Sequence, residues 1–70
     1  MGGLPQPEVG RIVHYINDAD EHQAAIITDY QGAGVINAHT WSRDGQGQAV
    51  TGVHYSSVPR RLTWHWPESA

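Results

Sequence analysis

The chain has no cysteine, no phenylalanine and no lysine among its 70 residues. Without cysteine, disulfides cannot stabilise the fold and a thiolate zinc site is excluded. Without phenylalanine, the three tryptophans and three tyrosines must supply all the large aromatic side chains. No apolar run approaches the ~20 residues that a membrane-spanning helix needs, and the N-terminus lacks the apolar region of a signal peptide. We therefore expect the protein to be cytosolic in the cell that makes it.

The charge balance also excludes a class of partner. The chain has seven acidic and four basic residues, for a net charge of -3. Because it has no basic stripe, long nucleic acid is not an expected partner. All four cations are arginines, whose planar guanidinium groups suit phosphate and aromatic ligands. A single domain of this size buries only about 60–65% of its unfolded surface, so we expect stability to be marginal and the chain to self-associate as a homo-oligomer.

Five segments have the composition or alternation of β-strands, and residues typical of turns separate them: 11–16, 23–30, 35–41, 48–55 and 61–66. No segment has a helical apolar period of useful length. Five short strands in 60 residues predict an all-β domain over 10–70, a five-stranded SH3-like, partly open barrel, with an OB-like barrel as the alternative. Residues 1–9 contain two prolines and two glycines and are predicted to form a flexible arm.

Alternation within the strands predicts which side chains share a face. In 35–41, the set Ile36, Ala38 and Thr40 opposes Val35, Asn37, His39 and Trp41. In 48–55, strict alternation sets Ala49, Thr51, Val53 and Tyr55 against Val50, Gly52 and His54.

Three blocks carry a family resemblance: Gly10 to Tyr15 (GRIVHY), Ala24 to Thr28 (AAIIT) and Thr63 to Glu68 (TWHWPE). In this order and spacing they resemble a family of small, functionally uncharacterised proteins found in actinobacteria and in the phages that infect them. The chain departs from the family pattern at Arg61-Leu62, where the family has a glycine. The resemblance implies a phage-related origin and a location in the host cytoplasm or in the virion, and it implies no particular activity.

The C-terminal segment offers the best candidate binding site. In an extended segment, Trp64 and Trp66 lie on one face while Thr63 and His65 lie on the other. Aromatic faces beside arginines suit a nucleotide-derived small molecule, because each base stacked on an aromatic ring contributes about 1–3 kcal/mol. We therefore expect a non-enzymatic binding module that sequesters such a ligand. The predicted site residues are Trp64, His65, Trp66, Arg60 and Arg61, completed across an interface by His14, Tyr15, His54 and Tyr55. One tryptophan is also expected to fill the small core.

The sequence is also compatible with two other functions. A structural protein of a virion, such as a capsid decoration or adaptor protein, would share the proline- and glycine-rich arm and the thin core. A small hydrolase would use His39, His54 and His65 as acid or base groups. Four of the five histidines, His14, His39, His54 and His65, fall on different predicted strands without the spacing of a metal motif, so neither a metal nor a cofactor is predicted.

Overall fold

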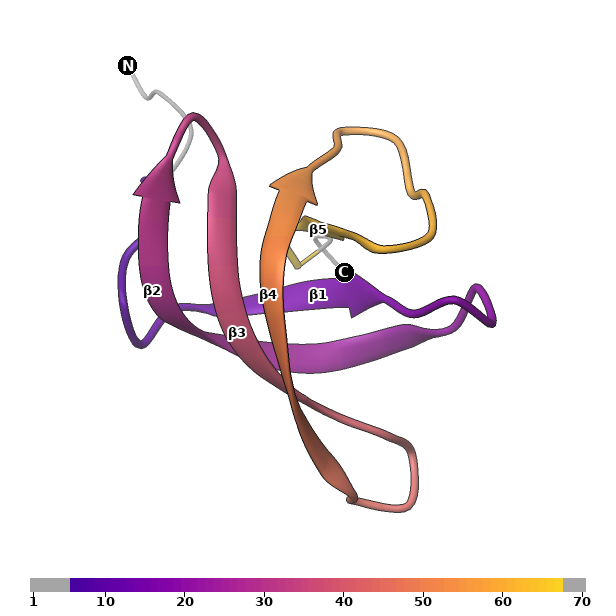
Figure 1. Ribbon diagram of the computed structural model, residues 1–70. Coiled ribbons are helices and arrows are strands. Elements are labelled where there is room, and N and C mark those ends of the chain that lie inside the picture. The colour runs from indigo at the N-terminus through magenta and orange to yellow at the C-terminus, as the bar shows by residue number, and fades with distance from the viewer. Residues whose placement is uncertain (1–5, 68–70) are drawn as a thin grey trace.

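The structure is a computed structural model that describes residues 6–67 (Figure 1). In it, segments of alternating and β-branched residues form five strands. The strands are β1 (Ile12–Ile16), β2 (His22–Gly32), β3 (Val35–Trp41), β4 (Gly47–Tyr55) and β5 (Thr63–His65). The predicted all-β fold, a small five-stranded barrel of the SH3-like or OB-like kind, is confirmed, but the barrel is closed and not partly open as predicted. Among the described residues, no helix has the length and apolar character needed to cross a membrane.

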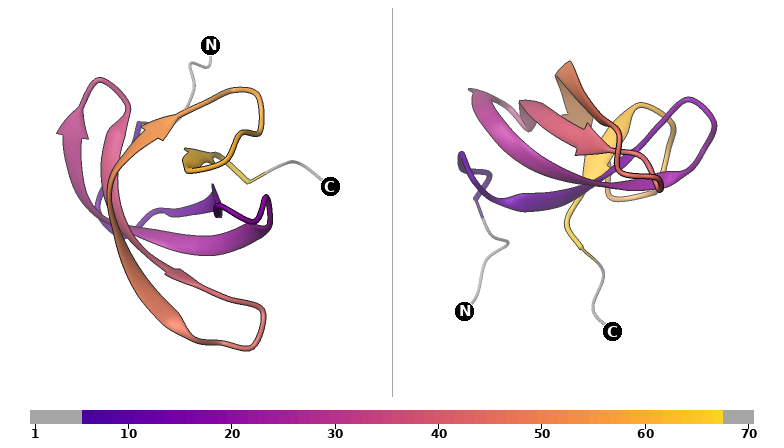
Figure 2. Two further views of the ribbon diagram at one scale, coloured as in Figure 1. Left: turned by 45° about the vertical axis from the view of Figure 1, so that its right-hand side comes forward. Right: turned by 90° about the horizontal axis from the view of Figure 1, so that it is seen from below.

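Neighbouring strands from β1 to β4 pair in antiparallel fashion, and β5 closes the barrel. β5 pairs with β1 in antiparallel and with β4 in parallel orientation. The long strand β2 curves through the molecule, so that it pairs first with β1 and then with β3 (Figures 1 and 2). Its register with β3 shifts between Ile27 and Asp29 and again between Tyr30 and Gly32. Such bulges bend a strand and let a short sheet close on itself.

The faces of β3 are as predicted, but those of β4 are not. Ile36, Ala38 and Thr40 are all buried, as expected for the inner face of β3. In β4, Val53 pairs with Ile36 but Val50 pairs with Ala38, so the two partners on β4 are one residue further apart than those on β3.

The extra residue in β4 is a β-bulge, in which Gly52 adopts φ 63°. The Gly52 N–H donates a 3.0 Å hydrogen bond to Oδ1 of Asn37, which fixes the bulge. Strict alternation along 48–55 was therefore wrong. Val53 is buried in the core, and Val50, predicted for the opposite face, packs against the same core.

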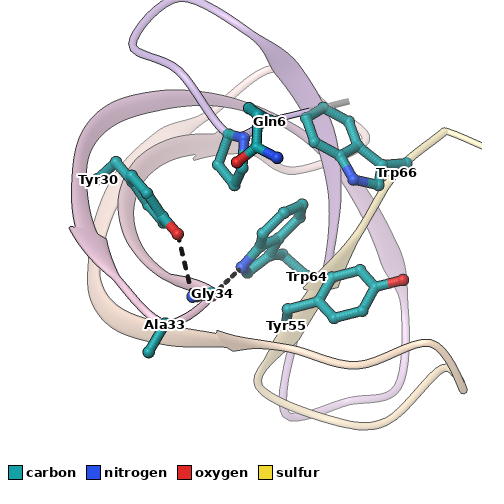
Figure 3. A pocket seen from close by; sticks show the side chains of 8 residues that line it. Gln6, Tyr30, Ala33, Gly34, Tyr55, Trp64 and Trp66 are labelled. Atoms are coloured by element: carbon teal, nitrogen blue, oxygen red, sulfur yellow. Dashed lines mark hydrogen bonds between the residues drawn. The ribbon is translucent and has the colours of Figure 1, made fainter. Parts of the chain in front are cut away.

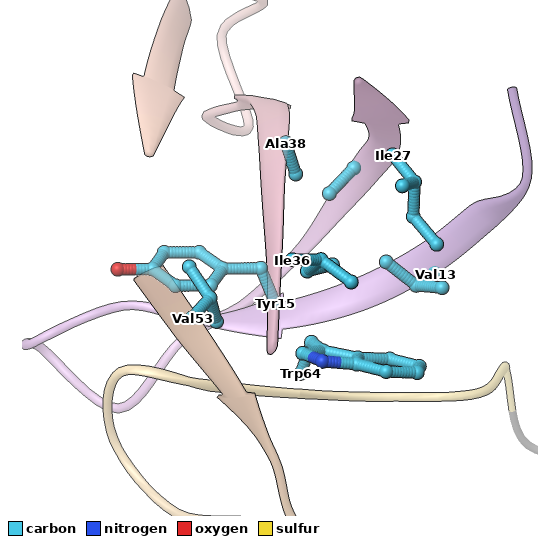
Figure 4. Packing of buried hydrophobic residues seen from close by; sticks show 8 residues of the cluster. Val13, Tyr15, Ile27, Ile36, Ala38, Val53 and Trp64 are labelled. Atoms are coloured by element: carbon cyan, nitrogen blue, oxygen red, sulfur yellow. The ribbon is translucent and has the colours of Figure 1, made fainter. Parts of the chain in front are cut away.

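The core lies inside the barrel and draws on all five strands (Figure 4). Its buried apolar members are Val13, Tyr15, Ala25, Ile27, Ile36, Ala38, Val53 and Trp64. Trp64 is only 1% exposed and is the largest fully buried side chain of the described residues. It therefore fills the interior in the way that the absence of phenylalanine predicts.

The two ends of the described chain differ from simple extended segments. Residues 1–5 of the predicted arm, 1–9, lie outside the described residues. In the rest of the arm, Glu8 pairs with Arg11 at 3.4 Å, and Gly10, which directly follows the arm, donates its N–H to the Ile27 oxygen at 2.8 Å. At the other end, β5 is shorter than the predicted 61–66. Leu62, with φ 62°, interrupts the predicted strand, and its N–H donates to the Ile16 oxygen at 2.6 Å.

Candidate functional site: an aromatic cavity at one end of the barrel

A cavity of about 300 Å³ opens at the end of the barrel where β2, β4 and β5 finish or begin (Figure 3). This volume is at the lower end of the range of small-molecule sites, about 300–1,000 Å³. Four aromatic side chains line it together with the β2–β3 turn and the segment before β1: Tyr30, Tyr55, Trp64 and Trp66, with Gln6, Pro7, Ala33 and Gly34. The wall is mainly aromatic and apolar, so a ligand would be held chiefly by ring contacts.

Gly34 holds the cavity wall together. Its backbone oxygen accepts hydrogen bonds from Trp64 Nε1 at 2.8 Å and from the Tyr55 N–H at 3.1 Å. Its own N–H donates to the Tyr30 hydroxyl at 3.4 Å (Figure 3). Gly34 has φ 81°, which favours glycine, and an added Cβ would lie 3.2 Å from Cβ of Tyr55. A single turn residue thus holds the side chains of Trp64 and Tyr30 and the backbone of Tyr55.

The aromatic side chains of the wall pack edge to face. Trp64 meets Tyr55 with ring centroids 5.0 Å apart and Trp66 with centroids 5.3 Å apart, in both cases in T-shaped arrangements. Trp64 is buried below them, whereas Tyr30 and Tyr55 are each 38% exposed and Trp66 is half-buried. Trp64 is therefore the floor of the cavity. Tyr30, Tyr55 and Trp66 have the accessible ring surface that a flat ligand could contact.

One arginine contacts Trp66 of the cavity wall without lining the cavity itself, and it is not one that the sequence suggested. Arg11 Cζ is 6.0 Å from the ring centroid of Trp66, within the range of a cation–π contact. Arg11 also pairs through Nε with the carboxylate of Glu8, at 3.4 Å. Arg60 and Arg61 do not line the cavity and are exposed in the loop between β4 and β5. Adjacency in sequence to the tryptophans did not bring them to the site.

The remaining predicted residues are spread over other parts of the barrel. Tyr55, Trp64 and Trp66 come together at the cavity, but Tyr15 is 7% exposed in the core, where burial and the nearby Asp18 raise the pKa of its phenol. His54 is exposed on β4.

The candidate acid or base histidines of a hydrolase do not share one place. The ring of His39 packs edge-on against Trp41 of the same strand, with centroids 4.8 Å apart. His54 lies on β4, and His65 belongs to a separate cluster of three histidines.

Three histidines from three strands meet on the barrel: His14 of β1, His22 of β2 and His65 of β5. Their ring centroids are 5.2–6.2 Å apart, and the rings stand at steep angles to one another, 73–83°. One ring nitrogen from each lies within 4.8 Å of the others. His65 is buried, His14 half-buried and His22 exposed. Of these, sequence reasoning considered His14 and His65 but overlooked His22, which begins β2.

Comparison with protein-family models, curated proteins and solved structures finds no match to this chain.

Proposed function

We propose that the barrel is a non-enzymatic binding module that holds a nucleotide-derived small molecule in the aromatic cavity. The observation that carries this proposal is the gathering of Tyr30, Tyr55, Trp64 and Trp66 around one open cavity of about 300 Å³. Neighbouring apolar side chains that share an open cavity often mark a binding site, and flat apolar rings are what a base can stack against.

The charge beside the cavity favours an anionic ligand over a neutral one. Arg11 stands over Trp66 and carries a planar guanidinium group that can donate two parallel hydrogen bonds to a phosphate. In this revised arrangement Arg11 takes the role that the sequence suggested for Arg60 and Arg61. A base in contact with Trp66 would place its attached phosphate within reach of this arginine. A free base or nucleoside would lose that contact.

The size of the cavity argues for a small ligand rather than a long strand. One aromatic cavity with one arginine in contact with its Trp66 wall gives no continuous track along which several phosphates could lie. We therefore propose mono-, di- or cyclic nucleotides as the ligand class. Sequestration of such a molecule would suit the phage-related origin that the family resemblance implies.

Thermal unfolding with a panel of mono-, di- and cyclic nucleotides tests the proposal. A ligand at one hundred times its Kd stabilises the folded state by about 2.7 kcal/mol. Trp66→Ala should abolish this response, and Arg11→Gln should weaken nucleotide binding more than nucleoside binding. Trp41→Ala is the matched control, because Trp41 is also half-buried but does not line the cavity. If no nucleotide raises the unfolding temperature at millimolar concentration, the proposal fails.

A structural role in a virion or another assembly is the second candidate, and one observation favours it. Several large apolar side chains are more than half exposed in the described residues: Val9, Ile12, Val58 and Leu62. Such side chains favour self-association, which we propose as the state of the protein in solution. Light scattering over a range of concentrations tests this. An assembly protein would also co-purify with particles and show no nucleotide response.

A further inference from the structure

We propose that His14, His22 and His65 form a binding site for a divalent transition-metal ion of the zinc class. This site is separate from the aromatic cavity, since none of the three histidines lines that cavity. The proposed metal site therefore does not depend on whether the aromatic cavity binds a nucleotide.

Strand register brings the three histidines together. His14 of β1 lies directly opposite His65 in the antiparallel β1–β5 pair. On its other side, β1 pairs with β2, where Ile16 lies opposite His22 and His14 lies opposite Ala24. His22 is therefore the diagonal neighbour of His14, a relation that long side chains can bridge. Alternation puts His14 and His65 on the opposite face from Val13, Tyr15 and Trp64, away from the core cluster.

The distances suit a metal after a small side-chain adjustment. Zinc binds imidazole nitrogen at about 2.0–2.1 Å, so tetrahedral ligand nitrogens lie about 3.4 Å apart. The three histidines offer nitrogens that already lie within 4.8 Å of one another. His65 is 6% exposed and provides a fixed ligand, whereas His22 is exposed and can rotate toward it. Bringing the three nitrogens to the spacing of metal ligands therefore requires movement mainly of the His22 ring.

The ligand set points to the kind of metal. Three neutral imidazoles suit zinc, copper, nickel and cobalt, whereas calcium and magnesium need oxygen ligands. Three protein ligands leave a fourth tetrahedral position for water or a small anion, as in zinc sites of the open type. Binding would also tie β5, which has only three residues, to β1 and β2. Metal should therefore stabilise the closure of the barrel as well as occupy the site.

The test uses the full chain, prepared without a polyhistidine tag, with Zn²⁺ and Co²⁺ as probes. Zinc at about one hundred times its Kd should raise the unfolding temperature by roughly 10 °C or more. Bound Co²⁺ should show the visible absorption of a tetrahedral site. His22→Ala should weaken zinc binding at least ~100-fold, because loss of an outer-shell partner alone costs about 10–100-fold. The apo fold should survive this change, since His22 is exposed.

Two control variants distinguish specific zinc binding by the three histidines from nonspecific binding by any exposed histidine. His54→Ala removes an exposed histidine of another strand and should leave zinc affinity unchanged. His14→Gln should weaken binding as His22→Ala does, and it avoids replacing the buried His65. The proposal is overturned if zinc leaves the unfolding temperature unchanged, or if His54→Ala weakens binding as much as His22→Ala.

Discussion

The indole Nε1 of Trp64 donates a 2.8 Å hydrogen bond to the backbone oxygen of Gly34, thirty residues earlier in the chain. This bond ties the last strand of the barrel to the β2–β3 turn. It also satisfies the one polar atom of the largest buried side chain. Trp64 is thus both the centre of the core and the floor of the cavity, so the stability of the barrel and the shape of its candidate site depend on the same side chain.

Replacing Trp64 tests this double role. Trp64→Phe removes the hydrogen bond and part of the buried ring, and should lower the free energy of unfolding by about 1–3 kcal/mol. Urea unfolding followed by circular dichroism measures the change. Trp41→Phe should have a smaller effect, because Trp41 is only half-buried. Equal losses in the two variants would contradict the assignment of Trp64 to the core.

Substitutions at two glycines with positive φ distinguish the cost of backbone strain from the cost of a steric clash. Gly34→Ala and Gly52→Ala both force a side chain into the left-handed region, which costs about 1–2 kcal/mol. Nothing lies within 4 Å of a Cβ at Gly52, but a Cβ at Gly34 would press on Tyr55 at 3.2 Å. Gly34→Ala should therefore be the more destabilising of the two in urea unfolding. The reverse order would show that the turn relaxes without disturbing the cavity wall.

Leu62 offers a substitution that should stabilise the protein. A leucine at φ 62° is strained, and its side chain is 56% exposed, so little packing is lost when it is removed. Leu62→Gly should raise the free energy of unfolding by up to about 1 kcal/mol, after allowance for the greater flexibility of glycine in the unfolded chain. Val58→Gly is the control, since Val58 is equally exposed in the same loop without a positive φ. A stabilising control or a destabilising Leu62→Gly would contradict the conformation at Leu62.

The turn between β3 and β4 predicts a pH effect. The Ser42 hydroxyl donates a hydrogen bond to the Asp44 carboxylate, and this bond holds the pKa of Asp44 below its ordinary value of 3.8, with backbone N–H groups adding to the effect. Because the folded pKa is depressed, the stabilisation is present above the unfolded pKa and is lost as pH falls through the folded pKa. NMR titration should show the Asp44 pKa rising in Ser42→Ala. An unchanged pKa would mean that the hydroxyl does not hold the carboxylate.

The sequence predicted the strands well because alternation and turn residues are local signals. The predicted span 35–41 coincides with β3, and its inner face is as expected. The bulge in β4 was missed because a single glycine, Gly52, is its only local signal in an otherwise alternating segment. β5 was predicted too long because a leucine rarely adopts a positive φ, so Leu62 itself gives no local signal that the extended segment is interrupted.

The candidate sites depended on contacts between distant parts of the chain. Tyr55, Trp64 and Trp66 were predicted to belong to a site, since their size and neighbours marked them. Arg11 was missed because it reaches Trp66 from the position just before β1, 55 residues away in sequence. The histidine cluster was missed for a similar reason, since His14, His22 and His65 have no motif spacing and only strand register unites them.

Ligand mapping by NMR is the most direct test that the aromatic cavity holds a nucleotide. With aromatic and backbone nuclei labelled, addition of the best nucleotide from the panel should shift the ring signals of Tyr30, Tyr55 and Trp66, and leave those of Trp41 in place. Shifts confined to the loop that carries Arg60 and Arg61, or no shifts at millimolar nucleotide, would contradict the assignment of the site.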